Sequence, residues 1–212
     1  MSGVLHPFLE LIRRRTSVEQ FDTQRELTER QIHDLVQDAT QAPSSFNIQH
    51  WRFVAVRTLA DRRRLREAAY GQLQVEQAPV TFIVLGDLDG VDKLPEIMEL
   101  AVDRGALPEG KAAAWVRMAR EIYGDEQLAR DEAIRSATLA AMMLMLAAEA
   151  RGMGSGALSG FDPQRVKREF GIPDRLLPVL LLAVGYPTPH PRRRMPRLTA
   201  DEVLSFDRCR DF

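Results

Sequence analysis

The chain has 212 residues and a mass of 24.0 kDa, which is enough to bury one good hydrophobic core. Its formal net charge of -1 gives no global attraction to nucleic acid or to an anionic membrane. Its single cysteine, Cys209, cannot form an internal disulfide, and no uninterrupted apolar stretch is long enough to span a bilayer. Together with an N-terminus that lacks a signal-peptide pattern, these features predict a cytoplasmic protein that binds neither nucleic acid nor membrane.

Two helices are predicted near the N-terminus. Residues 6–14 predict a short amphipathic helix, because four apolar side chains fall on roughly one face: Phe8, Leu9, Leu11 and Ile12. Thr28 and Gln31 form a plausible capping box for a second helix. Pro43 ends that helix, since its ring disfavours helical geometry at the preceding residue.

Two strands and three helices are predicted next. Residues 51–57 are rich in β-branched and aromatic side chains, and residues 79–86 are continuously apolar, which is typical of a strand buried on both faces. A charged helix over residues 59–70 lies between these strands. Residues 91–124 carry less hydrophobic material and predict two more exposed helices, a helical excursion from the core.

Residues 131–150 predict a helix that is apolar almost all round. Such a helix must be covered on all sides, and in a chain of this size a subunit interface is one way to cover it.

Three further elements are predicted in the last third of the chain: a short strand leading to Ser159, a helix that begins at Pro163, and a buried strand over residues 178–186. The tail from Pro187 is rich in proline and arginine, with Thr199 capping a last helical turn. No internal repeat or low-complexity linker divides the chain. The sequence therefore predicts one α+β domain over residues 1–212.

Several classes of site find no support in the sequence. Four histidines and one cysteine give no pair at metal-ligand spacing, and no Gly-x-Ser-x-Gly nucleophile elbow occurs. Residues 152–157 match the dinucleotide pattern G-x-G-x-x-A. However, a helix precedes them and a strand follows, which is the reverse of the order that such a site needs. We therefore interpret these glycines as a helix stop and a tight turn.

Arginine triplets occur at residues 13–15, 62–64 and 192–194. The middle triplet lies in a charged helix, and a solvated surface is the expected role there. The other two flank loops, where guanidinium groups beside Thr16 and Ser17 would suit a phosphate group. Composition alone leaves both a solvated surface and a phosphate site open for these two triplets.

The loop over residues 42–53 gathers side chains that both donate and accept hydrogen bonds: Ser44, Ser45, Asn47 and Gln49. The edge of a heteroaromatic ring with alternating carbonyls and nitrogens needs such partners. Taken in isolation, the same composition is also typical of a polar loop with turn-forming serines.

Five segments, in chain order, resemble motifs of the FMN-dependent nitroreductase family. Residues 14–22 (Arg-Arg-Thr-Ser-Val-Glu-Gln-Phe-Asp) resemble its Arg-x-Ser-x-(Arg/Lys)-x-Phe motif, and residues 42–53 resemble its Pro-Ser-Ser-x-Asn-x-Gln-Pro-Trp-x-Phe loop. Residues 152–162 are similar to its Gly-Phe-Asp turn, and residues 178–187 to its Pro-Val strand that ends in Gly-Tyr-Pro. Residues 192–196 are similar to its closing (Lys/Arg)-x-Arg-x-Pro element. The resemblance covers nearly the whole chain.

This resemblance implies an α+β fold with a central mixed, mainly antiparallel sheet flanked by helices, in an intertwined homodimer with two FMN sites built by both subunits. It also implies an NAD(P)H-dependent oxidoreductase. NAD(P)H gives a hydride to flavin N5, and a nitroaromatic, quinone or similar electrophilic acceptor then takes it at the same place. Residues 91–124 would shape the acceptor pocket, and no separate dinucleotide domain is required.

The resemblance assigns cofactor-binding residues by position but no catalytic side chain. The ribityl phosphate would be held by Arg14, Arg15, Thr16, Ser17, Arg192 and Arg194. The partner subunit would supply Pro43, Ser44, Ser45 and Asn47 to line the ring. After Leu158, the backbone N–H groups of Ser159 and Gly160 would face flavin N5, and Gln72 or Gln74 would contact the pyrimidine side.

Two positions depart from the family pattern. Glu19 stands where arginine or lysine is usual, which removes one positive charge near the flavin, and His50 stands where proline commonly precedes the tryptophan. Trp115 and Tyr123 are candidates to cap the site, although ordinary packing is the favoured interpretation.

Other functions stay open beside a nitroreductase activity. Within the family these are a flavin or enone reductase and an oxygen-dependent flavin-processing enzyme; a flavin-binding protein without turnover is a further alternative. Arginine triplets also occur in nucleic-acid-binding modules. That class is disfavoured by the net charge and by the lack of a basic recognition helix or an aromatic stacking platform.

Overall fold

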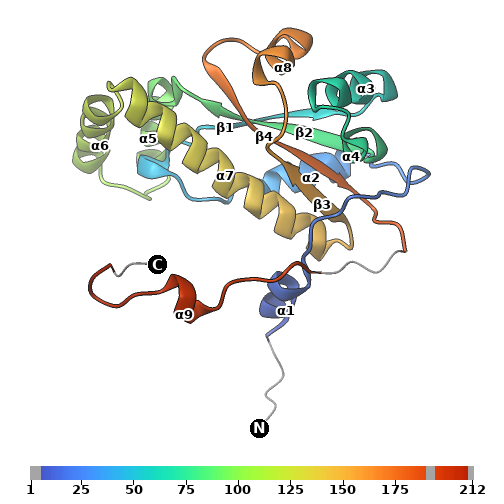
Figure 1. Ribbon diagram of the computed structural model, residues 1–212. Coiled ribbons are helices and arrows are strands. Elements are labelled where there is room, and N and C mark those ends of the chain that lie inside the picture. Colours follow the sequence, from blue (N-terminus) through green and yellow to red (C-terminus); the bar gives the residue numbers. More distant parts are fainter. Residues whose placement is uncertain (1–5, 190–193, 210–212) are drawn as a thin grey trace.

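The computed structural model describes residues 6–189 and 194–209, in which one four-stranded sheet lies between two layers of helices (Figure 1). The strand order is β1 (Trp51–Val56), β2 (Val80–Asp87), β4 (Leu176–Gly185) and β3 (Gly154–Leu158), and every neighbouring pair is antiparallel. Within the described residues, the one parallel pairing is an isolated bridge between Ser17 and Ser155. This arrangement confirms the predicted α+β class and the mainly antiparallel sheet.

The central strand β2 serves two hydrophobic cores because successive side chains point to opposite faces of the sheet. On one face, Val80, Phe82 and Val84 pack with the helices α2 (Glu29–Ala39) and α7 (Glu126–Ala150). On the other face, Ile83 and Leu85 pack with α3 (Leu59–Ala68), α4 (Leu73–Gln77) and α8 (Pro163–Phe170). Every residue of β2 is buried, which explains its continuous apolar run.

Local signals in the sequence set several helix ends. The Thr28 hydroxyl accepts a hydrogen bond from the Gln31 amide, and the Gln31 side chain accepts one from the Thr28 amide, which confirms the predicted capping box. The Asp162 side chain caps α8 by accepting a hydrogen bond from the Arg165 amide, and Gly171 ends that helix in the left-handed region with φ of 62°. The five-residue helix α4 was not predicted, since it is too short to show helical periodicity.

The long helix α7 packs on the sheet along one side, mostly through alanines. On the other side, Leu139 is 41% exposed and Met142 is 37% exposed. A single chain therefore covers only part of this helix, and the coverage of the rest by a subunit interface stays a prediction. By length and composition alone α7 could also cross a membrane, but 44% of its most apolar window is buried, as in the core helix of a globular protein.

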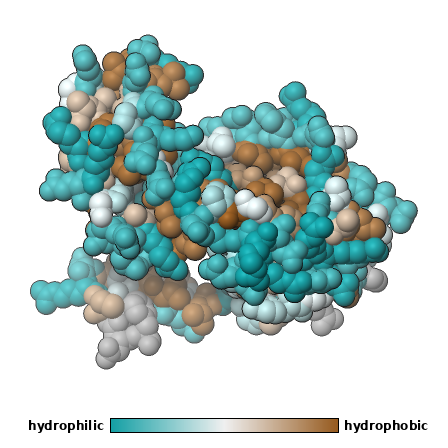
Figure 2. All heavy atoms as spheres, turned by 90° about the horizontal axis from the view of Figure 1, so that it is seen from above, coloured by the Kyte–Doolittle hydropathy of each residue, from teal (hydrophilic) through white to brown (hydrophobic). Residues whose placement is uncertain are grey.

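Residues 91–124 form the two predicted helices, α5 (Leu94–Asp103) and α6 (Glu109–Ile122), after the short 3-10 helix η2 (Gly90–Lys93). They pack on each other around a third, smaller core that includes Ile48 from the loop before β1. In Figures 1 and 2 the pair stands at the left as a lobe beside the sheet layers. The two predicted helices are present, and their role as a helical excursion near the substrate pocket stays a prediction.

The two ends of the described chain carry exposed apolar side chains. The predicted helix near the N-terminus is present as α1 (Pro7–Arg14), but Phe8, Leu9 and Ile12 on it are exposed. Residues 194–209 form an arm that extends from the body and contains α9 (Ala200–Val203), which has a capping box at Thr199 (Figure 1). Met195, Leu198 and Phe206 on this arm are each more than two thirds exposed.

Candidate functional site

The chain that leaves α1 lies directly against strand β3. The Val18 amide donates a hydrogen bond of 2.9 Å to the Ser155 carbonyl oxygen, and Ser17 and Ser155 form the isolated parallel bridge. This close approach requires Gly156, because a Cβ atom there would lie 2.5 Å from the Val18 carbonyl oxygen. The predicted phosphate-binding segment is thereby fixed to the sheet.

A cluster of guanidinium groups gathers at the C-terminal end of α1. Arg194 donates hydrogen bonds to the carbonyl oxygens of Ile12, Arg13 and Arg15, so the arm caps the helix. Burial, and next the positive charge of Arg194, lower the pKa of Arg15; the charge of Glu149 opposes this shift, and Arg197 acts in the same direction as Arg194. Neighbouring guanidinium groups favour an anion between them, so this cluster fits a phosphate group.

The other residues predicted at the phosphate end have different surroundings. The Arg14 Nε atom lies 2.9 Å from Glu149 Oε1, so Arg14 ties α1 to the C-terminal end of α7. Thr16 is half-buried and Ser17 is exposed. Arg192 lies outside the described residues. Direct contact of these four residues with a phosphate stays a prediction.

The far end of β3 presents two free backbone amides. Ser159 and Gly160 are exposed, and within residues 6–189 and 194–209 neither amide donates a hydrogen bond. Gln72 Nε2 donates a hydrogen bond of 2.7 Å to the Gly160 carbonyl oxygen, so Gln72 rather than Gln74 lies at this point. Leu158 is 5% exposed and packs into the core, so only its backbone is available to a ligand.

The loop over residues 43–49 lies elsewhere, between β1 and the lobe formed by α5 and α6. Its Ser45 amide donates a hydrogen bond of 3.3 Å to Glu132 Oε1, near the N-terminal end of α7. Pro43 and Asn47 are exposed, and Ser44 and Ser45 are half-buried.

One chain therefore brings together only part of the predicted site. Glu132 contacts the loop, whereas Glu149, which contacts α1, follows seventeen residues later in the same helix. That interval corresponds to about 25 Å along the axis of an α-helix. Within one chain, the loop is too far from α1 to share one small ligand with it.

The structure also shows buried charged side chains that the sequence analysis did not single out. Asp87 at the end of β2 is 1% exposed and pairs with Arg52 at 3.0 Å and with Arg175 at 2.8 Å. Glu132 is 4% exposed, pairs with Arg135, and accepts a hydrogen bond of 2.7 Å from the Ser136 hydroxyl. A carboxylate inside the otherwise apolar stripe of α7 is the signal that could have identified Glu132.

The departures from the family pattern have opposite environments. Glu19 is exposed, whereas His50 is fully buried, with its Nδ1 atom 2.7 Å from the Asp87 carbonyl oxygen. Burial lowers the pKa of His50, while the hydrogen bond to Asp87 and the charges of Glu132 and Asp87 oppose this shift. His50 is thus a neutral core residue that joins the loop to the end of β2.

The aromatic candidates of the α5–α6 lobe pack as expected. The Phe46 ring meets the rings of Trp115 and Tyr123 edge-on, with centroid distances of 5.8 Å and 6.5 Å. These contacts fix the loop against the lobe.

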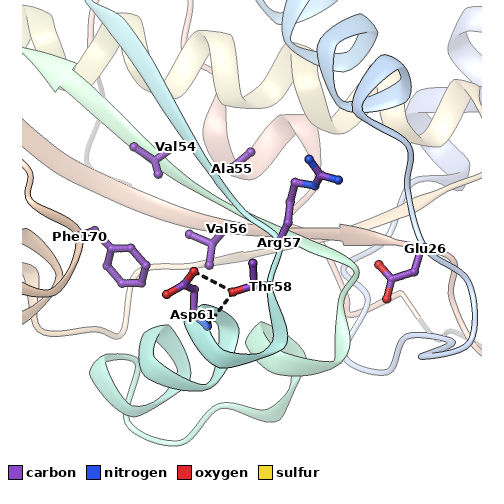
Figure 3. Close-up of a pocket in the computed structure, with 8 residues that line it drawn as sticks. All are labelled: Glu26, Val54, Ala55, Val56, Arg57, Thr58, Asp61 and Phe170. Atoms are coloured by element: carbon purple, nitrogen blue, oxygen red, sulfur yellow. Dashed lines mark hydrogen bonds between the residues drawn. The ribbon is translucent and has the colours of Figure 1, made fainter.

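A hollow at the outer edge of the sheet is not part of this arrangement. Its lining comes from β1, the start of α3, the end of α8 and Glu26, and it contains none of the residues predicted to bind a cofactor (Figure 3). In the part of the chain that the structure describes, no group of three metal-ligating side chains occurs.

Comparison with known proteins gives one consistent result. Residues 12–186 match the model of the nitroreductase family. The chain is 32% identical to the Bacillus subtilis protein named as NAD(P)H nitroreductase YodC, over 84% of this chain and 88% of that protein. It is 37% identical to a Thermus thermophilus protein named NADH dehydrogenase, over 78% and 80% of the two chains.

One similar solved structure contains a bound cofactor. A protein of Exiguobacterium sibiricum, described as a nitroreductase in complex with FMN, superimposes with a TM-score of 0.88 at 26% identity. The match covers 98% of this chain and 100% of that one.

Proposed function

Because the chain belongs to the nitroreductase family, we propose that it is an FMN-dependent oxidoreductase that uses NAD(P)H to reduce nitroaromatic, quinone or similar electrophilic compounds. One observation carries the proposal: two suitable groups lie at opposite ends of β3. The cationic cluster around Arg15 lies near Ser155, which pairs with Ser17. The amides of Ser159 and Gly160, which donate no hydrogen bond within the described residues, lie at the other end. FMN, when bound, supplies the group that accepts and releases a hydride.

The residues at these two ends suit the two ends of FMN. Arg15 and Arg194 would hold the phosphate through charge-assisted hydrogen bonds, beside Ser17. Ser159 follows Ser155 by four positions of extended chain, a span of roughly 13 Å, which is the scale of the path from a phosphate to a flavin ring. The free amides there would donate toward the ring and stabilise negative charge on it. We assign no general acid, since water can supply the protons.

We infer that the active form is a homodimer. The exposed face of α7 is centred on Leu139 and Met142, which is also the midpoint between Glu132 and Glu149. Two copies of α7 that pack antiparallel about this midpoint would place the Glu132 end of one helix level with the Glu149 end of the other. The exposed apolar side chains of α1 and of the arm extend this surface.

Such a dimer would complete the site. The loop that carries Ser44, Ser45 and Asn47 would come from one subunit, and the arginine cluster with the end of β3 from the other. The separation of the two parts within one chain, about 25 Å, supports this arrangement. We further propose that the chain acts as one domain in the cytoplasm, which cell fractionation would check.

The visible spectrum of the purified protein, before and after anaerobic addition of NADPH or NADH, tests the function. We expect a flavin spectrum that bleaches with at least one nucleotide and recovers on addition of a nitroaromatic or a quinone. A colourless protein that does not take up added FMN would contradict the proposal. Bound flavin that neither nucleotide reduces would indicate the alternative of a flavin-binding protein without turnover.

Acceptor assays separate the remaining alternatives. Turnover with enones or free flavins that exceeds turnover with nitroaromatics and quinones would indicate an enone or flavin reductase, and oxygen-dependent conversion of the flavin would indicate a flavin-processing enzyme. The helices α5 and α6 would shape this selectivity, because they pack directly on Phe46 of the loop.

A further inference from the structure

The loop before β1 holds an unfavourable backbone conformation. Phe46, Asn47 and Gln49 have φ values of 50°, 58° and 58°, in the left-handed region that side chains other than glycine rarely adopt. Asparagine tolerates this region, whereas phenylalanine and glutamine do so poorly. Such a run of residues persists only where surrounding contacts determine it.

Buried carboxylates supply those contacts at both ends of the loop. At one end, Glu132 Oε1 accepts hydrogen bonds from the Ser45 amide at 3.3 Å and from the Ser136 hydroxyl at 2.7 Å. At the other end, Arg52, which pairs with Asp87, donates a hydrogen bond of 2.8 Å to the Gln49 carbonyl oxygen. The loop is thus held by acids that solvent does not reach.

Glu132 is the anchor that contacts the segment predicted to line the flavin. A buried carboxylate on the sheet-facing side of a helix is unfavourable unless its oxygens are satisfied, and here the loop amide is one of its donors. Since the Ser45 amide is occupied by Glu132, the loop offers side chains rather than this backbone group to a ligand. In the described residues, the Ser45 hydroxyl and the Asn47 side-chain amide make no hydrogen bond.

We propose that Glu132 is a positioning residue: its carboxylate fixes the Ser45 amide and thereby the turn that presents Ser44, Ser45 and Asn47 to the flavin bound across the dimer interface. This inference rests on the proposed function. Glu132 does not touch the flavin; it acts through the backbone of the loop.

Hydrogen exchange of the flavin-free protein tests the anchor directly, together with FMN titration. For E132A we expect amides of residues 43–50 to exchange about tenfold faster, with exchange in β2 unchanged, and FMN to bind about tenfold more weakly. E132Q keeps an acceptor oxygen, so its loop exchange and FMN affinity should stay within about threefold of the parent protein. The matched control is D131A, which removes a neighbouring acid whose carboxylate accepts a hydrogen bond from Gln127 of the same helix, and which should change neither quantity.

Several outcomes would overturn the inference. These are loop exchange in E132A equal to that in D131A, faster exchange throughout the core rather than in the loop, or E132Q failing as badly as E132A. If E132A does not fold, S136A removes one donor to the same carboxylate and should loosen the loop in the same direction to a smaller extent; no loosening would overturn the inference. Failure of the unmodified protein to bind FMN would remove the proposed function, whereas the exchange result would still decide whether Glu132 holds the loop.

Discussion

The two ends of α7 hold two different halves of the candidate site. At the C-terminal end, Arg14 and Glu149 attach α1, and the neighbouring cations are the half-buried Arg15 and the exposed Arg194. At the N-terminal end, Glu132 is nine-tenths or more buried and holds a loop with a strained backbone. The first half is suited to bind an anionic group of a ligand. The second half is suited to hold the loop side chains in a fixed position against that ligand.

This difference is the basis of the proposed homodimer. Each half is organised within its own chain, by contacts that need no partner, but the halves lie about 25 Å apart along one rigid helix. A rigid helix cannot bend to bring them together, and in the proposed homodimer the second copy supplies the other half. The exposed centre of α7 is the natural place for that copy to dock.

The largest effect is expected when the two halves are separated. The double variant L139E/M142E places charges at the exposed centre of α7, where burial against a second copy would be unfavourable. We expect a monomer in sedimentation or light scattering and FMN affinity lowered more than about 100-fold. The matched control is L59E on α3, since Leu59 is 46% exposed and far from the proposed interface. A monomer that binds FMN normally would show that the site lies within one chain.

The next largest effect concerns the cationic half alone. R15A removes a charge-assisted partner of the phosphate, so FMN affinity should fall by roughly 10- to 100-fold. The affinity for riboflavin, which has no phosphate, should not change. Fluorescence titration with both flavins measures this, and R63A on α3 is the control because Arg63 pairs with Glu76 on the surface. Equal losses for FMN and riboflavin would place Arg15 away from the phosphate.

Heterodimers of two variants test whether each site combines the loop half of one subunit with the cationic half of the other, and the expected change in FMN binding is smaller. N47V puts a β-branched residue where φ is 58° and should disturb the loop half, while R15A disturbs the cationic half. If each site combines the two halves from different subunits, a heterodimer of these variants has one site with both defects and one intact site. Titration of differently tagged, co-expressed chains should then recover about half of the FMN sites. No recovery would contradict a site shared between subunits.

The smallest expected effect is the pH dependence contributed by His50. Burial lowers the pKa of His50 in the folded protein below the value of 6.5 expected when the chain is unfolded. The unfolded state therefore binds the proton more strongly, and stability falls as the pH drops below 6.5 toward the depressed pKa. Thermal unfolding between pH 7.5 and pH 5 should show a steeper loss for the parent protein than for H50Q. Parallel curves would mean that His50 does not contribute.

Much of the fold could be predicted because its signals are local. The capping box of Thr28 and Gln31, the Asp162–Pro163 helix start and the apolar run of β2 are decided by neighbouring residues, and the structure confirms each. The short helix α4 carries no such periodic signal. Among the site residues, Gln72 could be distinguished from Gln74 only by its contact with Gly160.

The elements, their order and the family motifs follow from the sequence, since these depend on spacing along the chain. Tertiary structure alone decided that Glu132 and Ser45 meet, because a hydrogen bond between residues 87 positions apart leaves no periodic trace in the sequence. It also decided that a single chain covers α7 on one side only. The composition of a helix indicates only that its apolar side chains are to be buried, whereas the geometry of the whole assembly decides which surface packs on them.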